Sequence, residues 1–182
     1  MTIPQDVIYL DHNATTPLDP AAIEAMIHAM REDFGNPSSP YSLGLRARDA
    51  VEQARIRVAR LLGCLSREIV FTSGGSESNN MALKGSVDLG NPGACHIVTS
   101  LVEHPAILNP SLFLMELGVE VTFLKVDRFG RVDPGDVKKA IQPKTRLISI
   151  MLANNETGTL QPIRDIVHIA GEHGIPVHTD AA

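Results

Sequence analysis

The stretch RLISIMLANNETGTLQPIRDIVHIAGEHGIPVHTDAA, residues 146–182, decides the fold class of this chain. Residues 146–152 form a short apolar run that predicts a buried strand. Residues 162–173 predict a helix that ends at Gly174, and residues 175–179 predict another strand. Strand, helix and strand in this order indicate parallel strands that are joined by a helical crossover.

The same alternation runs back along the chain as far as Glu68. The predicted strands cover residues 69–72, 95–99 and 119–124, and the predicted helices cover residues 76–87, 105–117 and a segment opened by Asp133-Pro134. We expect Ser76 to be the N-cap of its helix and Gly118 to end the next one. The pattern predicts an α/β fold with a mostly parallel sheet and helices on its faces.

The first 65 residues have a different, helical pattern. Asp19-Pro20 opens a predicted helix, and a longer helix is predicted over residues 43–62, with Gly63 at its end. Residues 34–40 between them are too rich in turn formers to be regular. One buried stripe is predicted on the first helix, made of Ile23, Met26, Ile27 and Met30.

Composition excludes several classes of protein. Of the 182 residues, 43% are apolar and 20% are charged, which excludes a disordered or fibrous chain. Sixteen basic against twenty-one acidic residues give a net charge of −5, which argues against a nucleic-acid surface. The apolar runs are shorter than the roughly 20 residues that span a membrane, and no secretory signal pattern is visible. Two cysteines make no disulfide framework, so we expect a cytoplasmic protein.

Polar residues follow the predicted strands, where parallel α/β sheets bind their ligands. Gly74 and Gly75 let the backbone approach a ligand, and the helix that Ser76 opens has free N–H groups that suit a phosphate. A simple glycine turn with a serine cap is the alternative. His104 follows the next strand and is either a polar turn residue or a group that moves protons and stacks on a flat ring.

Two further strand ends carry an amide and a carboxylate. Asn154 and Asn155 either make a local turn or hold a ligand oxygen with a side-chain amide. Asp180 would be costly to bury alone, and no lysine or arginine stands near it in the sequence. A protonated ring nitrogen of a cofactor would serve as its partner. A phosphate cradle, a planar side chain, an amide and a carboxylate on one edge suit pyridoxal 5′-phosphate.

Six motifs occur in this order along the chain: YLDHNATTP at 9–17, GNPSS at 35–39, TSGGSESNN at 72–80, EH at 103–104, NNETG at 154–158 and HTDAA at 178–182. With these motifs the chain resembles the cysteine desulfurases of the class V aminotransferase superfamily, in the branch that serves iron–sulfur cluster and nitrogenase assembly. The resemblance implies the large domain of a fold-type-I pyridoxal-phosphate enzyme that is normally a homodimer. It also implies removal of sulfur from L-cysteine, which leaves L-alanine and an enzyme persulfide for a sulfur-acceptor or iron–sulfur scaffold protein.

The resemblance also assigns roles to individual residues. Gly75 and Ser76 correspond to the phosphate-binding pair. His104 corresponds to the catalytic residue that stacks on the cofactor ring and helps to move protons. Asn155 corresponds to the amide that meets the ring hydroxyl oxygen and the substrate carboxylate, and Asp180 to the partner of the pyridinium nitrogen.

The resemblance places the Schiff-base lysine and the nucleophilic cysteine after Ala182, so we expect an N-terminal fragment that is inactive alone. Residues 1–15 are then a segment that joins the small domain, and residues 16–182 an incomplete cofactor-binding large domain. Cys64 and Cys95 are expected to be buried or half-buried apolar residues. The lysines expected to be solvated are Lys84, Lys125, Lys138, Lys139 and Lys144.

Three alternatives remain open for the function. A selenocysteine lyase shares the cofactor and many of these motifs, and another aminotransferase-like enzyme of class V is also compatible. A truncated, non-catalytic chain that binds a partner is the alternative from a different class. No metal, nucleic-acid or membrane partner is expected.

Overall fold

A computed structural model describes residues 7–182, and the chain divides into two compact units, Met1–Phe71 and Thr72–Ala182. The first six residues of the expected segment 1–15 lie outside the described residues. The division into residues 1–15 and 16–182 stays a prediction. Within residues 7–182, no helix is both long enough and apolar enough to cross a membrane.

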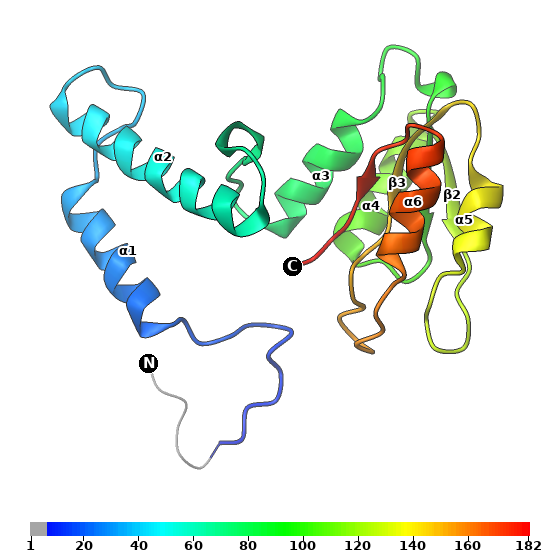
Figure 1. Cartoon of the computed structure of the whole chain (residues 1–182), viewed down its shortest axis with the longest axis horizontal. Coiled ribbons are helices and arrows are strands. Elements are labelled where there is room, and N and C mark those ends of the chain that lie inside the picture. The colour runs from blue at the N-terminus through cyan, green and yellow to red at the C-terminus, as the bar shows by residue number, and fades with distance from the viewer. Residues whose placement is uncertain (1–6) are drawn as a thin grey trace. The chain divides into compact units, whose positions relative to one another are not determined.

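The second unit contains a four-stranded sheet in the order β2-β1-β3-β4 (Figure 1). Its strands are β1 His96–Ser100, β2 Glu120–Leu124, β3 Thr145–Ser149 and β4 Val177–His178. All three pairings are parallel, which confirms the predicted sheet. Strands β3 and β4 are shorter than predicted, but their backbone pairing continues beyond them, because Ile150 N donates to His178 O at 3.1 Å.

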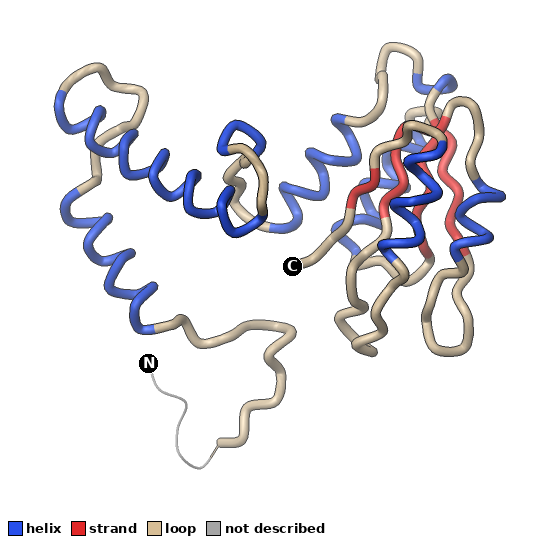
Figure 2. The backbone as a smooth tube through the Cα atoms, in the orientation of Figure 1, coloured by secondary structure: helices blue, strands red, loops and turns tan. Residues whose placement is uncertain are grey.

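Helices cover both faces of this sheet (Figure 2). They are α3 Gly75–Gly85, α4 Pro105–Glu116, α5 Pro134–Ala140 and α6 Ile163–Glu172, with a short 3-10 helix, η2 Pro92–Ala94, before β1. Ile97 belongs to the apolar cluster beneath α3 and α4, whereas Val98 belongs to the cluster beneath α5 and α6. Neighbouring residues of one strand point to opposite faces, so both cores share the same strands.

Local capping residues explain where these helices begin and end. Asp133 accepts a hydrogen bond from Gly135 N at 2.7 Å and caps α5. Gly118 follows α4 with φ 97°, and Gly174 follows α6 with φ 65°. Both angles lie in the region that favours glycine, so the predicted helix ends at these two glycines are confirmed.

The first unit is helical, as predicted, but the apolar stripe of its first helix is only half-buried at Ile23 and Ile27 and exposed at Met26 and Met30. It contains α1 Pro20–Glu32, α2 Ser42–Leu62 and the 3-10 helix η1 Ser66–Glu68. The prediction of a buried stripe on α1 is wrong, because no residue of this helix is buried and the Met30 side chain is 68% exposed. An amphipathic face becomes buried only where another element packs on it. Within the described part of this unit, none covers α1 to that extent.

The strand predicted over residues 69–72 is also absent. These residues have no regular structure, and Phe71 is 49% exposed. A strand needs a neighbour that pairs with its N–H and C=O groups, and none of the described strands pairs with this segment. Arg55 holds it instead: its guanidinium donates to Ile69 O at 2.5 Å and lies 5.0 Å from the centre of the Phe71 ring.

Candidate functional site

The first turn of α3 presents Gly75 and Ser76. The prediction that Ser76 is the N-cap is wrong, because Gly74 occupies that position and Ser76 is the second residue of the helix. The preceding turn is fixed by Glu77, whose carboxylate accepts from Ser73 N at 2.6 Å and from Ser73 Oγ at 2.5 Å. The Ser76 hydroxyl is therefore not used to cap the helix.

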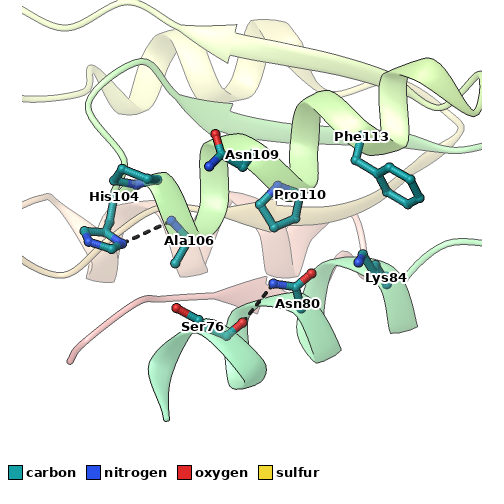
Figure 3. Close-up of a pocket in the computed structure, with 9 residues that line it drawn as sticks. Ser76, Asn80, Lys84, His104, Ala106, Asn109, Pro110 and Phe113 are labelled. Carbon is teal, nitrogen blue, oxygen red and sulfur yellow. Dashed lines mark hydrogen bonds between the residues drawn. The ribbon is translucent and has the colours of Figure 1, made fainter.

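His104 lies at the start of α4 and is the N-cap of that helix. Its Nδ1 accepts a hydrogen bond from Ala106 N at 3.1 Å, so the neutral ring carries its proton on Nε2 (Figure 3). His104 and Ser76 line one cavity of about 410 Å³, together with Asn80, Asn109 and other residues of α3 and α4. The structure thus brings together two of the predicted site residues from different helices.

Asp180 lies just after β4, half-buried, and is tied to α3. Its Oδ2 accepts from Asn79 Nδ2 at 2.8 Å, and its Oδ1 accepts from Ala182 N at 3.2 Å. A Cβ added to Gly75 would lie 3.5 Å from the Ala182 side chain, so the segment after β4 passes beside the first turn of α3. Gly75 and Asp180 therefore belong to the same corner of the unit.

Sequence reasoning missed Asn79, which is 3% exposed. The helical period offers a signal, because Asn79 is three residues after Ser76 and lies on the same face of α3. Asp180 was expected to need a cationic partner. The structure pairs it with the Asn79 amide instead, and no ion pair involves Asp180 among residues 7–182.

The two asparagines after β3 have different surroundings. Asn154 makes a local turn, because its Oδ1 accepts from Glu156 N at 3.0 Å and from Thr157 N at 2.9 Å. Asn155 is exposed and donates from Nδ2 to the Glu156 side chain at 3.0 Å. The structure does not place Asn155 in the cavity that Ser76 and His104 line.

Glu103 is a second residue that the sequence did not single out as a site residue. Its side chain is almost wholly buried, with the residue 4% exposed. Burial raises the pKa of Glu103 to about 7; hydrogen bonds from Ser100 and Met151 oppose this rise, and the negative charge of Asp180 adds to it. An acid that changes charge near neutral pH thus stands directly before His104.

His178 is the neighbour of Asp180 on β4. Its Nδ1 lies 3.0 Å from Ser149 Oγ on the adjacent strand. Burial lowers the pKa of His178, while the charge of Asp180 opposes this shift. The ring is therefore neutral at physiological pH and does not neutralise the Asp180 carboxylate.

The remaining expectations concern the lysines and the cysteines. Lys84 lines the cavity near α3, is exposed, and has its Nζ 4.9 Å from the centre of the Phe113 ring. Cys64 is half-buried and Cys95 is buried, both as free thiols, which confirms their expected placement. Of the other lysines, Lys125, Lys138 and Lys139 are exposed and Lys144 is partly exposed in an ion pair with Glu120.

The sequence profile of the aminotransferase class-V family matches residues 8–182. Among similar proteins, cysteine desulfurase IscS of Dictyoglomus turgidum is 53% identical over 174 residues, and that of Methanosarcina thermophila is 48% identical over 174 residues. These alignments cover 96% of this chain but 44% and 43% of the two relatives. The chain therefore spans less than half the length of the relatives it matches.

Solved structures also match nearly the whole of this chain with about half of their own length. The structure of SspA in complex with cysteine matches with a TM-score of 0.91 and 43% identity, over 96% of this chain and 50% of that one. The apo structure of a cysteine desulfurase from Thermococcus onnurineus matches with a TM-score of 0.84 and 30% identity, over 100% of this chain and 48% of that one. The chain thus shares its fold with these solved structures over 96% to 100% of its length.

Proposed function

Because the chain belongs to the aminotransferase class-V family, we propose that the whole protein is a pyridoxal-phosphate-dependent cysteine desulfurase. It takes sulfur from L-cysteine, leaves L-alanine and holds the sulfur as a persulfide on an enzyme cysteine. The observation that carries this proposal is the corner where Ser76, His104 and the Asn79–Asp180 pair come from three separate elements. Relatives named cysteine desulfurase and a neighbour solved with cysteine support cysteine as the substrate.

The first turn of α3 fits the phosphate of the cofactor. No side chain among the described residues caps this helix end, so its N–H groups remain available to an anion. Gly75 has no side chain to block the approach, and the Ser76 hydroxyl can donate a further hydrogen bond. In this proposal Gly75 and Ser76 hold the phosphate.

The Asn79–Asp180 pair fits the ring of the cofactor. The Asn79 amide occupies one oxygen of Asp180 and fixes the direction of the carboxylate. A carboxylate in this position keeps a facing ring nitrogen protonated. The bound cofactor supplies an electron sink that stabilises negative charge on the substrate carbon.

His104 and Asn155 complete the proposed set of site residues. The hydrogen bond from Ala106 N fixes the His104 ring, so that its Nε2 is the atom that can hold or release a proton. His104 is the proposed catalytic residue and also stacks on the ring. Asn155 is proposed to hold the ring hydroxyl oxygen and the substrate carboxylate, for which its exposed position leaves access.

The biological setting is part of the same proposal. The whole protein is proposed to act as a homodimer that delivers sulfur to an acceptor or iron–sulfur scaffold protein. Residues 16–182 then form part of the cofactor-binding large domain, and residues 1–15 join the small domain. The proposed location is the cytoplasm, where the free thiols Cys64 and Cys95 would stay reduced.

The test is an assay of the whole protein with pyridoxal phosphate, L-cysteine and a thiol reductant. We expect equimolar alanine and sulfide without any keto acid. Asp180→Ala should abolish turnover, while Asp165→Ala, on the exposed side of α6, should leave it unchanged. Faster turnover of selenocysteine would favour the lyase alternative, a requirement for a keto acid would favour an aminotransferase, and no turnover with either amino acid would contradict the proposal.

A further inference from the structure

We propose that Glu103 is a positioning residue that fixes the loop carrying His104 to the segment after β3, and through it to Asp180 after β4. We propose further that the charge of Glu103 makes the affinity of the site for the cofactor depend on pH. This inference rests on the proposed function and adds to it a residue that none of the expected roles includes. It also predicts a regulation of the site by the charge of one buried side chain.

The Glu103 carboxylate links the ends of two strands. Its Oε1 accepts from Ser100 Oγ, the last residue of β1, at 2.7 Å. Both of its oxygens lie 3.1 Å from Met151 N, which follows β3. The loop between β1 and α4 is thus fixed to the neighbouring strand at the residue before His104.

A second contact fixes the same loop. Asn154 donates from Nδ2 to Val102 O at 2.9 Å, while its Oδ1 shapes the turn after β3. Two adjacent residues of the loop, Val102 and Glu103, are therefore bound to the segment after β3. His104 extends from a backbone that has little freedom to shift.

The path continues from Met151 to Asp180. Leu152, the next residue, donates from its N–H to Asp180 O at 2.8 Å. Covalent bonds and hydrogen bonds thus connect His104, Glu103, Met151, Leu152 and Asp180 in one series. A change in how Glu103 holds Met151 acts on both ends of this series, where the proposed catalytic residue and the proposed ring partner lie.

Among the described residues, no positively charged side chain forms an ion pair with Glu103. Its neighbours are Ser100 at the end of β1, the Met151 amide after β3 and Asp180 after β4. Of these, Asp180 is the charged group, and its negative charge, together with burial, favours the protonated form of Glu103. Burial lowers the pKa of His178, which precedes Asp180 by two residues, and so disfavours its charged form.

The protonated and the ionised form of Glu103 affect the proposed cofactor site differently. When Glu103 is protonated, its O–H can donate to Ser100 Oγ while the other oxygen accepts from Met151 N. When it is ionised, it adds a second negative charge near Asp180, which favours a cation in front of that carboxylate. A protonated ring nitrogen is such a cation, so ionised Glu103 should tighten the hold on the cofactor.

Glu103→Gln matches the protonated state in shape and charge. Its amide can donate to Ser100 Oγ, and its oxygen can accept from Met151 N. Glu103→Asp keeps the charge but shortens the side chain, so it weakens the link to Met151. Glu116→Gln, which removes an exposed acid at the end of α4 that forms no ion pair among the described residues, is the control for charge loss alone.

The experiment measures the dissociation constant of pyridoxal phosphate from the cofactor-free whole protein between pH 6 and pH 8.5. We expect Glu103→Gln to bind as wild type at pH 6 and about tenfold more weakly above pH 8, an effect of the size of one pKa unit. Glu116→Gln should follow wild type throughout. Infrared difference spectra should show a protonated carboxyl group that titrates near neutrality and is missing in Glu103→Gln.

Three results would overturn this inference. A ratio of dissociation constants that does not change with pH would show that Glu103 is only structural. Normal cofactor binding by Glu103→Asp at every pH would show that the link to Met151 is irrelevant. An infrared spectrum without the titrating carboxyl group would show that Glu103 does not change its charge in this pH range. Failure of the wild type to bind the cofactor at all would contradict the proposed function too, so the two failures are distinguishable.

Discussion

Replacing the buried acid Glu103 by glutamine should change how the stability of the protein depends on pH. A pKa of about 7 in the folded state, in place of the ordinary 4.5, means that the folded protein binds this proton more tightly than the unfolded chain. The stabilisation is therefore complete below pH 4.5 and is lost as the pH rises through 7. The difference corresponds to about 3 kcal/mol in the free energy of unfolding.

Glutamine cannot ionise, so Glu103→Gln removes this pH dependence and retains the shape of the protonated acid. Relative to wild type, the variant should gain about 3 kcal/mol of unfolding free energy between pH 4.5 and pH 8. Little screening by solvent is expected, because the residue is 4% exposed. Urea denaturation of the cofactor-free whole protein at four or more pH values measures this difference.

The control for this experiment is Glu116→Gln, which removes an exposed acid at the end of α4 that forms no ion pair among the described residues. Its unfolding free energy should differ from that of wild type by the same small amount at each pH, because exposed charges contribute little. A difference between Glu103→Gln and wild type that stays constant from pH 4.5 to pH 8 would refute the reasoning. It would mean that the buried carboxyl group keeps an ordinary affinity for its proton.

Three further substitutions test other parts of the unit. Asn79→Ala should cost about 1–2 kcal/mol in urea denaturation and weaken cofactor binding, because Asp180 loses a hydrogen-bond donor at 2.8 Å. Leu83→Ala should cost about 2–5 kcal/mol by the same measurement, since this fully buried side chain belongs to the core beneath α3. Gly118→Ala should cost about 1–2 kcal/mol, because φ is 97° there, and a lower thermal midpoint would report it.

Each of these substitutions has a matched control in the same chain. Asn91→Ala removes an exposed amide that lies outside the cavity of Ser76 and His104, so it should spare cofactor binding. Leu160→Ala removes a side chain of the second unit that is 68% exposed and should be nearly neutral. Gly171→Ala, inside α6 with open space around the added Cβ, should stabilise by up to about 1 kcal/mol. Equal effects within any pair would contradict the corresponding argument.

The parts of the fold that could be predicted are those determined by neighbours in sequence. Asp133 caps α5 through a residue two positions away, and Gly118 and Gly174 end their helices through their own backbone angles. The order of strands and helices follows from local periodicity in the same way. The strand over residues 69–72 failed because pairing depends on a distant partner, and the α1 stripe failed because burial depends on what packs against it.

The residues of the candidate site also differ in whether their position depends on near or distant parts of the sequence. The positions of His104 and Asp180 after β1 and β4 could be predicted, because the ends of parallel strands meet at one edge of a sheet. Ser76 was singled out by the same rule, although the segment before it, residues 69–72, forms no strand. Asn79 and Glu103 were missed, since the Asp180 and Met151 groups that they bind are 101 and 48 residues away along the chain. The N-cap at Ser76 was wrong by two residues because Glu77 fixes the turn before the helix through Ser73. The strand-end position singled out Asn154 and Asn155 together, the resemblance chose Asn155 between them, and its role remains a prediction.

The buried thiol of Cys95 makes the second unit easy to monitor. Asp88 N lies 3.3 Å from its Sγ, and the residue has no exposed surface. Of these two thiols, a thiol-reactive dye should therefore modify half-buried Cys64 first and reach Cys95 only when the second unit opens locally. The ratio of the two labelling rates would serve as a natural reporter of local opening, without the need to introduce a probe.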